Sequence, residues 1–260
     1  MDPTVSEWLN LVFRWLHVLA GIMWIGHLWF FNFVNAQVVK TYTPESKKQV
    51  VPELMPRALY WFRWGAAYTW VTGILLLVLV YFVGGVMITG DGSMGPHAVG
   101  GIGLVLIVIY FAIYDVLWKN LKNELAGIAI SFVLLAVYLF VLKSVGMSGR
   151  ALFIYAGGLF GTIMAANVWM RIWPAQRKII AGVKGTAPAP DASVAATAGL
   201  RSKHNTYMSV PLVLTMISNH FPTVYGNEYA WLIVLVFVAV GWGMTKFLYN
   251  KAASAAPASF

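Results

Sequence analysis

The 260-residue sequence contains no cysteine and very little charge. Without cysteine, these residues hold no disulfide, no cysteine-ligated zinc or iron–sulfur cluster, and no covalently attached c-type haem. Charged residues make up 10% of the chain and hydrophobic residues make up 60%. Soluble domains carry about 25% charged residues, and a chain with far fewer cannot cover a globule with polar surface. The composition therefore predicts an integral membrane protein, with the lipid bilayer as a partner.

Acidic residues are the scarcer of the charged groups. The chain has 9 Asp and Glu against 18 Lys and Arg, a formal net charge of +9. The basic residues gather in loops between apolar stretches, which is typical of membrane proteins, so we expect no nucleic-acid partner. The N-terminus reads MDPTVSEW and is acidic, whereas a signal peptide begins with basic residues. No cleavable signal is therefore expected.

Seven apolar stretches are candidates for membrane-spanning helices, which need roughly 20 residues each. They cover residues 8–34, 59–84, 98–118, 125–142, 151–173, 207–221 and 229–249. The sixth is short and contains Pro211, so we expect a bent helix there. The sequence thus predicts an all-α bundle of about seven transmembrane helices.

The distribution of Lys and Arg predicts the orientation of this bundle. Basic residues gather in residues 37–57, 119–122 and 177–203 and at the C-terminal end, that is, in alternate loops. Cytoplasmic loops carry the excess of basic residues, so the N-terminus is expected outside and the C-terminus in the cytoplasm. Opposite sides for the two termini require an odd number of spans, which agrees with seven.

The chain is expected to form one polytopic membrane domain over residues 1–250. Residues 184–200 are rich in alanine and proline and predict a flexible cytoplasmic loop. The run GDGSMGPH at 90–97 predicts a turn, and residues 251–260 predict a disordered C-terminal tail.

Histidines in the apolar stretches are the first candidates for function, because ionisable groups at membrane depth are costly. His17 and His27 are ten residues apart in the first stretch, so about 80° separates their faces on a helix and they mark different levels. His204 and His220 bracket the sixth stretch, so we pair His27 with His204 and His17 with His220. Neutral imidazole is a common ligand of haem iron, and all four are possible iron ligands of haem b. Each histidine is equally open to a role in helix–helix hydrogen bonding.

Three stretches resemble the membrane (N-terminal) domain of the bacterial cytochrome c-linked urate oxidase, or urate hydroxylase, family. They are RWLHVLAGIMWIGH at 14–27, MAANVWMRIWPAQRKI at 164–179 and RSKHNTYMSVPLVLTMISNHFP at 201–222. The resemblance covers nearly the whole chain and implies a multi-pass protein of the bacterial inner (plasma) membrane that oxidises urate to 5-hydroxyisourate. Family members pass electrons through a C-terminal cytochrome c domain. No Cys-x-x-Cys-His follows the last stretch here, so we expect a separate cytochrome c or another electron acceptor.

The implied substrate, a small planar anion, suggests roles for particular residues. A cation and amide donors are needed to hold the ring, and we expect Arg201 and Asn167 to bind the substrate. A base is needed to take a proton, and histidine suits this role near neutral pH. The catalytic candidates are His204, Asn205, Asn219 and His220. Asn167 is equally open to a helix–helix hydrogen bond.

Oxidation also needs an electron acceptor, which the side chains do not provide, and haem b suits a chain without cysteine. We expect His17 and His27 to bind this cofactor. Two alternatives stay open from the sequence. In the first alternative, the chain is a haem b electron-transfer subunit of a partner dehydrogenase. In the second, the chain transports purine anions and its bent sixth helix lines the transport path.

Overall fold

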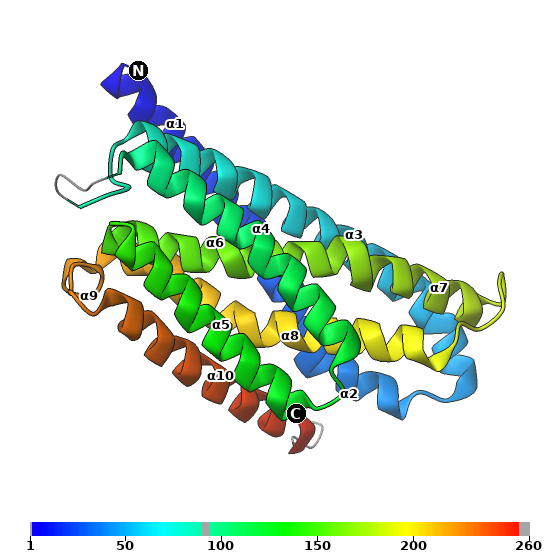
Figure 1. Cartoon of the computed structure of the whole chain (residues 1–260). Helices are drawn as coiled ribbons and strands as arrows, with labels where there is room; N and C mark the ends of the chain where they lie inside the picture. The colour runs from blue at the N-terminus through cyan, green and yellow to red at the C-terminus, as the bar shows by residue number, and fades with distance from the viewer. Residues whose placement is uncertain (1, 90–93, 255–260) are drawn as a thin grey trace. The chain divides into compact units, whose positions relative to one another are not determined.

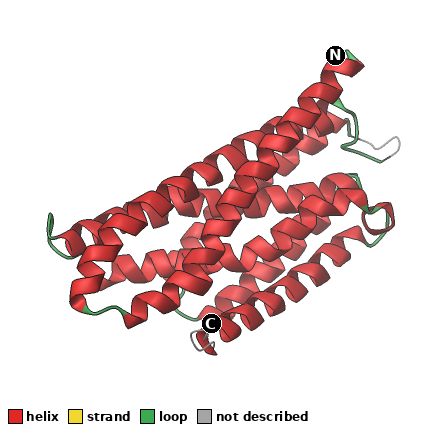
Figure 2. Cartoon of the chain, turned by 180° about the vertical axis from the view of Figure 1, so that it is seen from behind, coloured by secondary structure: helices red, strands yellow, loops and turns green. Residues whose placement is uncertain are grey.

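The computed structural model describes residues 2–89 and 94–254, and helices account for nearly all of them (Figures 1 and 2). Eight helices of twelve residues or more appear in these ranges. They are α1 (Pro3–Trp29), α3 (Pro44–Leu76), α4 (Pro96–Asn120), α5 (Glu124–Ser144), α6 (Gly149–Asn167), α7 (Trp173–Lys184), α8 (Ala192–Ile217) and α10 (Ala230–Ser254). The described ranges contain no strand, only an isolated bridge between Ile88 and Met147. The predicted all-α class is confirmed.

Short helical segments extend or connect these helices. Three are π-helical: η1 (Phe30–Asn35), η3 (Leu77–Val83) and η4 (Val168–Ile172). The others are α2 (Ala36–Val38), η2 (Val39–Thr41), η5 (Ser218–His220) and α9 (Pro222–Tyr225). The π segments continue existing helices, because η1 follows α1, η3 follows α3 and η4 follows α6 without an intervening loop.

Within the described ranges, six continuous helices are long and apolar enough to cross a membrane. They are Pro3–Thr41, Pro44–Val83, Pro96–Asn120, Glu124–Ser144, Gly149–Lys184 and Ala230–Ser254. Each contains one of the predicted apolar stretches or most of it, which supports a membrane protein. The predicted stretch 207–221 is the exception, because it lies in α8 and η5 and does not meet the same criterion.

Helix α8 corrects two predicted boundaries. It has 26 residues and includes Pro211, so the sixth helix is not short. It begins at Ala192, so about half of the predicted flexible loop 184–200 is helical. Alanine favours helix, and Asp191 caps the first turn by accepting a hydrogen bond of 2.8 Å from the Ser193 N–H. Of the predicted tail, residues 251–254 continue α10. Residues 255–260, like residues 90–93 of the predicted turn, lie outside the described ranges.

The chain divides into two compact units. Unit 1 consists of Met1–Phe13, Gly73–Ile163 and Pro211–Val240, and unit 2 of Arg14–Thr72, Met164–Val210 and Gly241–Phe260. In unit 1, α6 is held to its neighbours by tyrosines. The Tyr155 hydroxyl donates to the Gly100 carbonyl (2.9 Å), and the Tyr138 hydroxyl donates to the Tyr155 carbonyl (3.2 Å). Each bond satisfies a buried hydroxyl, as a low-dielectric interior requires.

In unit 2, α1 and α3 approach each other closely at Gly65. A Cβ atom added there would lie 3.1 Å from the backbone nitrogen of Trp24 and 3.2 Å from the Trp24 Cα. Small residues allow such backbone approach between membrane helices. The buried side of α1 is formed by Ala20, Trp24 and Leu28. These residues are at most 6% exposed, and their spacing of four residues places them on one side of the helix.

We predict that Gly65→Val lowers the melting temperature in detergent by several degrees, because the new side chain forces α1 away from α3. The matched control is Gly243→Val, since a Cβ at Gly243 has no neighbour within 4 Å. Both variants carry the same β-branched residue in a helix. The melting temperatures are measured by thermal unfolding in detergent. Equal values for the two variants would contradict the close contact between α1 and α3.

Candidate functional site

Six of the eight predicted site residues lie in unit 2, and three of them, Arg201, His204 and Asn205, lie on α8. Arg201, Asn205 and Ser209 follow one another at intervals of four residues, so they share one helix face. Their side chains are between 0 and 1% exposed, as is that of Thr206. A row of buried polar groups on one helix is costly unless each is satisfied inside the protein. The neighbours of this face therefore define the candidate site.

Asn167 and Asn205 form a buried amide pair between the end of α6 and α8. The Asn167 Nδ2 donates to the Asn205 Oδ1 at 2.9 Å, and the Asn205 Nδ2 donates to the Met164 carbonyl at 3.0 Å. Both ends of the Asn205 amide are thus engaged within the protein. The structure brings these two predicted residues together, and the bonds they make are of the helix–helix kind.

A second set of hydrogen bonds ties α8 to α1 and α10 through Asn32 in η1. The Asn32 Nδ2 donates to the Ser202 Oγ at 2.9 Å, and its Oδ1 accepts from the Tyr249 hydroxyl at 2.9 Å. The Trp29 Nε1 donates to the Ser209 Oγ, also at 2.9 Å. We did not single out Asn32 from the sequence. The signal was an amide between aromatic residues in FFNF.

His17 and His27 each hold one ring nitrogen in a hydrogen bond. The His27 Nδ1 lies 2.7 Å from the Met23 carbonyl, which only accepts, so Nδ1 carries the proton. The His17 Nδ1 lies 3.0 Å from the Thr72 hydroxyl, whose own proton goes to the Tyr68 carbonyl at 2.6 Å. Nδ1 is therefore the donor in both rings, and Nε2 keeps its lone pair in both.

This donor set fits haem iron. A ligating histidine commonly donates its other ring N–H to a carbonyl or a similar acceptor, which fixes the tautomer and the ring orientation. Met23 and Thr72 provide this support for His27 and His17. Among the described residues, no three His, Asp or Glu side chains cluster to hold a metal ion, but haem iron needs only one or two imidazoles.

His204 is half-buried on α8, between Arg201 and Asn205 in sequence, and its Nε2 atom is buried. Arg201 precedes it by three residues, so both side chains lie on neighbouring parts of the helix surface. A neutral imidazole beside a buried guanidinium can accept a proton from an anion that the guanidinium holds.

Asn219 and His220 belong to η5 in unit 1. The Asn219 Oδ1 accepts from the Tyr81 hydroxyl at 2.9 Å and from the Arg150 Nε at 2.8 Å. His220 is exposed at the end of η5. Asn219 is thus grouped with Arg150 and Tyr81, two residues that we had not selected from the sequence. The predicted pairing of His17 with His220 stays a prediction.

Arg63 lies among aromatic rings, which we also had not expected. Its guanidinium carbon is 4.1 Å from the centre of the Trp173 ring, and the rings of Tyr60, Trp64 and Trp169 lie within 6.0 Å. Cation–π contacts of this kind stabilise a desolvated guanidinium. Arg63 and Trp64 thereby connect α3 to η4 and α7.

Comparison with known proteins identifies the family. A model of the family described as "Urate oxidase N-terminal" matches residues 3–50 and 40–259. The chain belongs to this family. No curated protein and no solved structure matches the chain. The resemblance seen in residues 14–27, 164–179 and 201–222 is confirmed, and membership of the Urate oxidase N-terminal family associates the chain with a urate-related function.

We predict that Asn205→Ala destabilises the protein by about 1–2 kcal/mol, because it leaves Asn167 and the Met164 carbonyl without this partner in a buried site. The measurement is unfolding in detergent. Asn250→Ala is the matched control, since Asn250 is exposed on α10. We also expect Asn205→Ala to weaken substrate use without loss of haem. Unchanged stability would show that the amide pair does not hold α8, and unchanged kinetics would remove Asn205 from the site.

Proposed function

We propose that the chain is the membrane part of an oxidoreductase that oxidises urate, or a related purine, and passes the electrons to a cytochrome c. The observation that carries this proposal is the family match, which extends over nearly the whole chain. The buried polar face of α8 and the two hydrogen-bonded histidines of α1 support it. The cytochrome c would be supplied from outside these 260 residues, since they contain no cysteine to attach its c-type haem.

The proposed topology has seven spans in the bacterial inner membrane, with α8 added to the six apolar helices. Helix α8 is more polar than the others, and its buried hydrogen bonds offset the cost of placing polar groups at membrane depth. The excess of Lys and Arg in alternate loops then places the N-terminus outside and the C-terminus in the cytoplasm. This arrangement is the one expected from the sequence.

Arg201 is the proposed anchor of the substrate. Urate is a planar monoanion at neutral pH, and a guanidinium presents a planar set of donors that matches carbonyl oxygens on one edge of such a ring. Arg201 is only 1% exposed, so its charge acts in a poorly screened environment. The Asn167–Asn205 pair fixes the part of α8 that carries Arg201, and Asn167 borders the same face.

The proposed reaction converts urate and one water into 5-hydroxyisourate, with release of two electrons and two protons. A new C–O bond forms at C5 from the water oxygen. His204, three residues after Arg201 on α8, would accept a proton in this step. Asn219 and His220 remain candidates for a second proton-handling site in unit 1, where Arg150 supplies a positive charge.

His17 and His27, which lie at different levels of α1, are the residues that would each hold a haem b. The bound haem would supply a reversible one-electron acceptor, which the side chains of this chain lack. Thr72 and the Met23 carbonyl would keep each imidazole in the tautomer that leaves Nε2 available. Two successive one-electron transfers to a cytochrome c are needed for each urate oxidised.

We predict that the purified protein, expressed with ample haem, shows a Soret band that urate alone shifts to the reduced position under anaerobic conditions. The product 5-hydroxyisourate should appear in proportion. No Soret band would rule out a haem b protein. A band that urate leaves oxidised, while a partner's substrate reduces it, would favour an electron-transfer subunit. Urate uptake into liposomes without product would favour a transporter.

We predict that His17→Ala and His27→Ala each lose more of the bound haem than His97→Ala does, because each removes a proposed iron ligand. His97→Ala is the matched control, since His97 is exposed and its ring stacks on Phe82 at 5.9 Å. The measurement is the ratio of Soret to protein absorbance after purification. Equal haem content in all three variants would show that neither His17 nor His27 is a ligand.

A further inference from the structure

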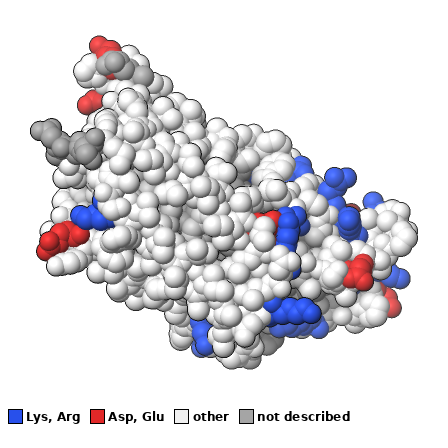
Figure 3. Space-filling view, in the orientation of Figure 1, with Lys and Arg blue, Asp and Glu red and all other residues white. Residues whose placement is uncertain are grey.

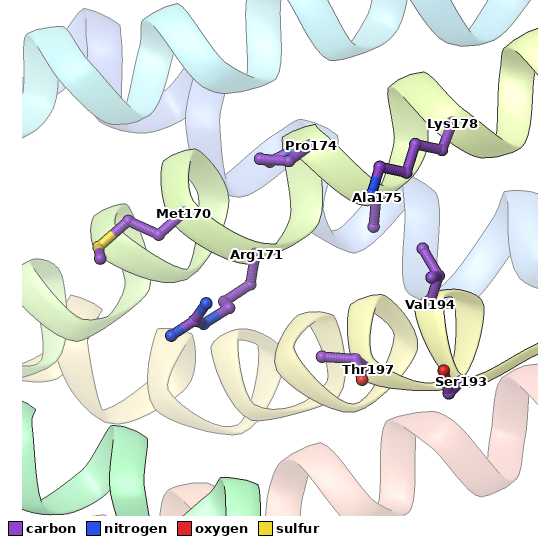
Figure 4. A pocket seen from close by; sticks show the side chains of 8 residues that line it. All are labelled: Met170, Arg171, Pro174, Ala175, Lys178, Ser193, Val194 and Thr197. Carbon is purple, nitrogen blue, oxygen red and sulfur yellow. The ribbon is translucent and has the colours of Figure 1, made fainter. Parts of the chain in front are cut away.

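A groove between α7 and α8 in unit 2 plays no part in the proposed oxidation. Its volume is about 240 Å³. Figure 4 shows the eight lining residues on the facing helices, with Arg171 extending toward α8. One wall comes from η4 and α7 and the other from the first two turns of α8. The residues are Met170, Arg171, Pro174, Ala175, Lys178, Ser193, Val194 and Thr197.

The polar lining of the groove suits an anion. Arg171 and Lys178 are seven residues apart, two helical turns, so they lie on the same side of the η4–α7 helix. Thr197 adds a hydroxyl from the opposite wall. Guanidinium, ammonium and hydroxyl groups together are the usual donors to phosphate oxygens.

One acidic residue adjoins the groove and limits what binds there. The hydroxyl and the N–H of Ser193 donate to the Asp191 carboxylate, which holds the pKa of Asp191 below its usual value. Ser193 is therefore already engaged. The groove also has Arg171, Lys178 and Thr197, and the two positive charges of Arg171 and Lys178 exceed the single negative charge of Asp191.

The wider charge of unit 2 reinforces this preference. Unit 2 contains fourteen of the 18 Lys and Arg residues and three of the nine Asp and Glu residues. Figure 3 shows more Lys and Arg than Asp and Glu side chains toward the right and the lower edge of the face in view. Basic pockets next to membrane helices favour anionic headgroups over zwitterionic ones.

The apolar lining indicates a lipid rather than a free ion. Met170, Pro174 and Val194 line the groove beside the cations. Met170 is 53% exposed and its neighbour Trp169 is 37% exposed, at the end of the apolar part of the helix Gly149–Lys184. Exposed apolar side chains on a membrane helix face acyl chains, and tryptophan favours the headgroup level. The groove therefore has an apolar surface directly beside the cationic side chains of Arg171 and Lys178.

We infer that this groove binds the phosphate of an anionic phospholipid, with Arg171 and Lys178 on the phosphate and the acyl chains along Met170 and Trp169. The same phosphate chemistry is available from inorganic phosphate, which lacks the acyl chains. The inference does not depend on urate oxidation, since none of the lining residues belongs to the proposed substrate or haem sites.

The test uses the full chain in detergent and native mass spectrometry with dioctanoyl phosphatidylglycerol. Arg171→Gln with Lys178→Gln should weaken binding roughly tenfold or more, because two positive charges are removed from the phosphate. The matched control is Arg177→Gln with Lys184→Gln, which removes the same charge from α7 outside this groove and should bind like the wild type. Dioctanoyl phosphatidylcholine should bind much more weakly than phosphatidylglycerol to the wild type.

Three results would overturn the inference. Equal weakening in both double variants would show a general effect of charge. Equal binding of phosphatidylcholine would show that the anionic headgroup is not recognised. Competition by inorganic phosphate at a concentration equal to that of the lipid would assign the groove to free phosphate. If the Arg171 and Lys178 variant does not fold, Val194→Trp fills the groove without changing charge, and unchanged lipid affinity in that variant would equally contradict the inference.

Discussion

The polar face of α8 is the constraint on which the arrangement of unit 2 depends. Arg201, Asn205 and Ser209 are buried in a protein that is otherwise largely apolar, and a buried polar group without a partner costs about 1–3 kcal/mol. Asn167 from α6 and Trp29 from α1 meet this face with hydrogen bonds. Helix α8 has no stretch as apolar as those of the six membrane-spanning candidates. These hydrogen bonds offset the free-energy cost of burying its polar groups. They also fix α8, which carries both the buried Arg201 and His204.

The π-helical segments contribute to the same requirement. η1 contains Asn32, which reaches Ser202, and η4 directly follows Asn167. In unit 1, η3 contains Tyr81, which reaches Asn219. π segments widen a helix by one residue and re-aim the side chains near them, and they are common at functional sites. In this chain each contains or adjoins a polar side chain that hydrogen-bonds to a residue between 201 and 220.

Much of the fold was predictable, because membrane helices have a strong sequence signal. Six of the seven predicted stretches coincide with long apolar helices, since hydrocarbon requires a run of apolar residues whatever the neighbours are. The start of α8 was not predictable in this way, because Ala- and Pro-rich composition resembles a flexible loop and helix formation there rests on alanine and the Asp191 cap. For the site, the sequence indicated Asn167 and Asn205 as separate residues but not their mutual bond. It gave no sign of the Arg63 contacts with Trp173 or of the groove beside Arg171, because these depend on which helix faces lie opposite one another.

The sequence alone therefore determined the class of protein, the approximate helices and the family. Each follows from local composition or from the order of short motifs, which need no knowledge of helix packing. Only the tertiary structure decided which polar groups meet, such as His17 with Thr72 and Asn32 with Tyr249. These contacts join residues far apart in the chain, and their geometry depends on how closely the helices approach at positions such as Gly65. The proposed role of His17 depends on that packing, because Thr72 on α3 decides which of its ring nitrogens carries the proton.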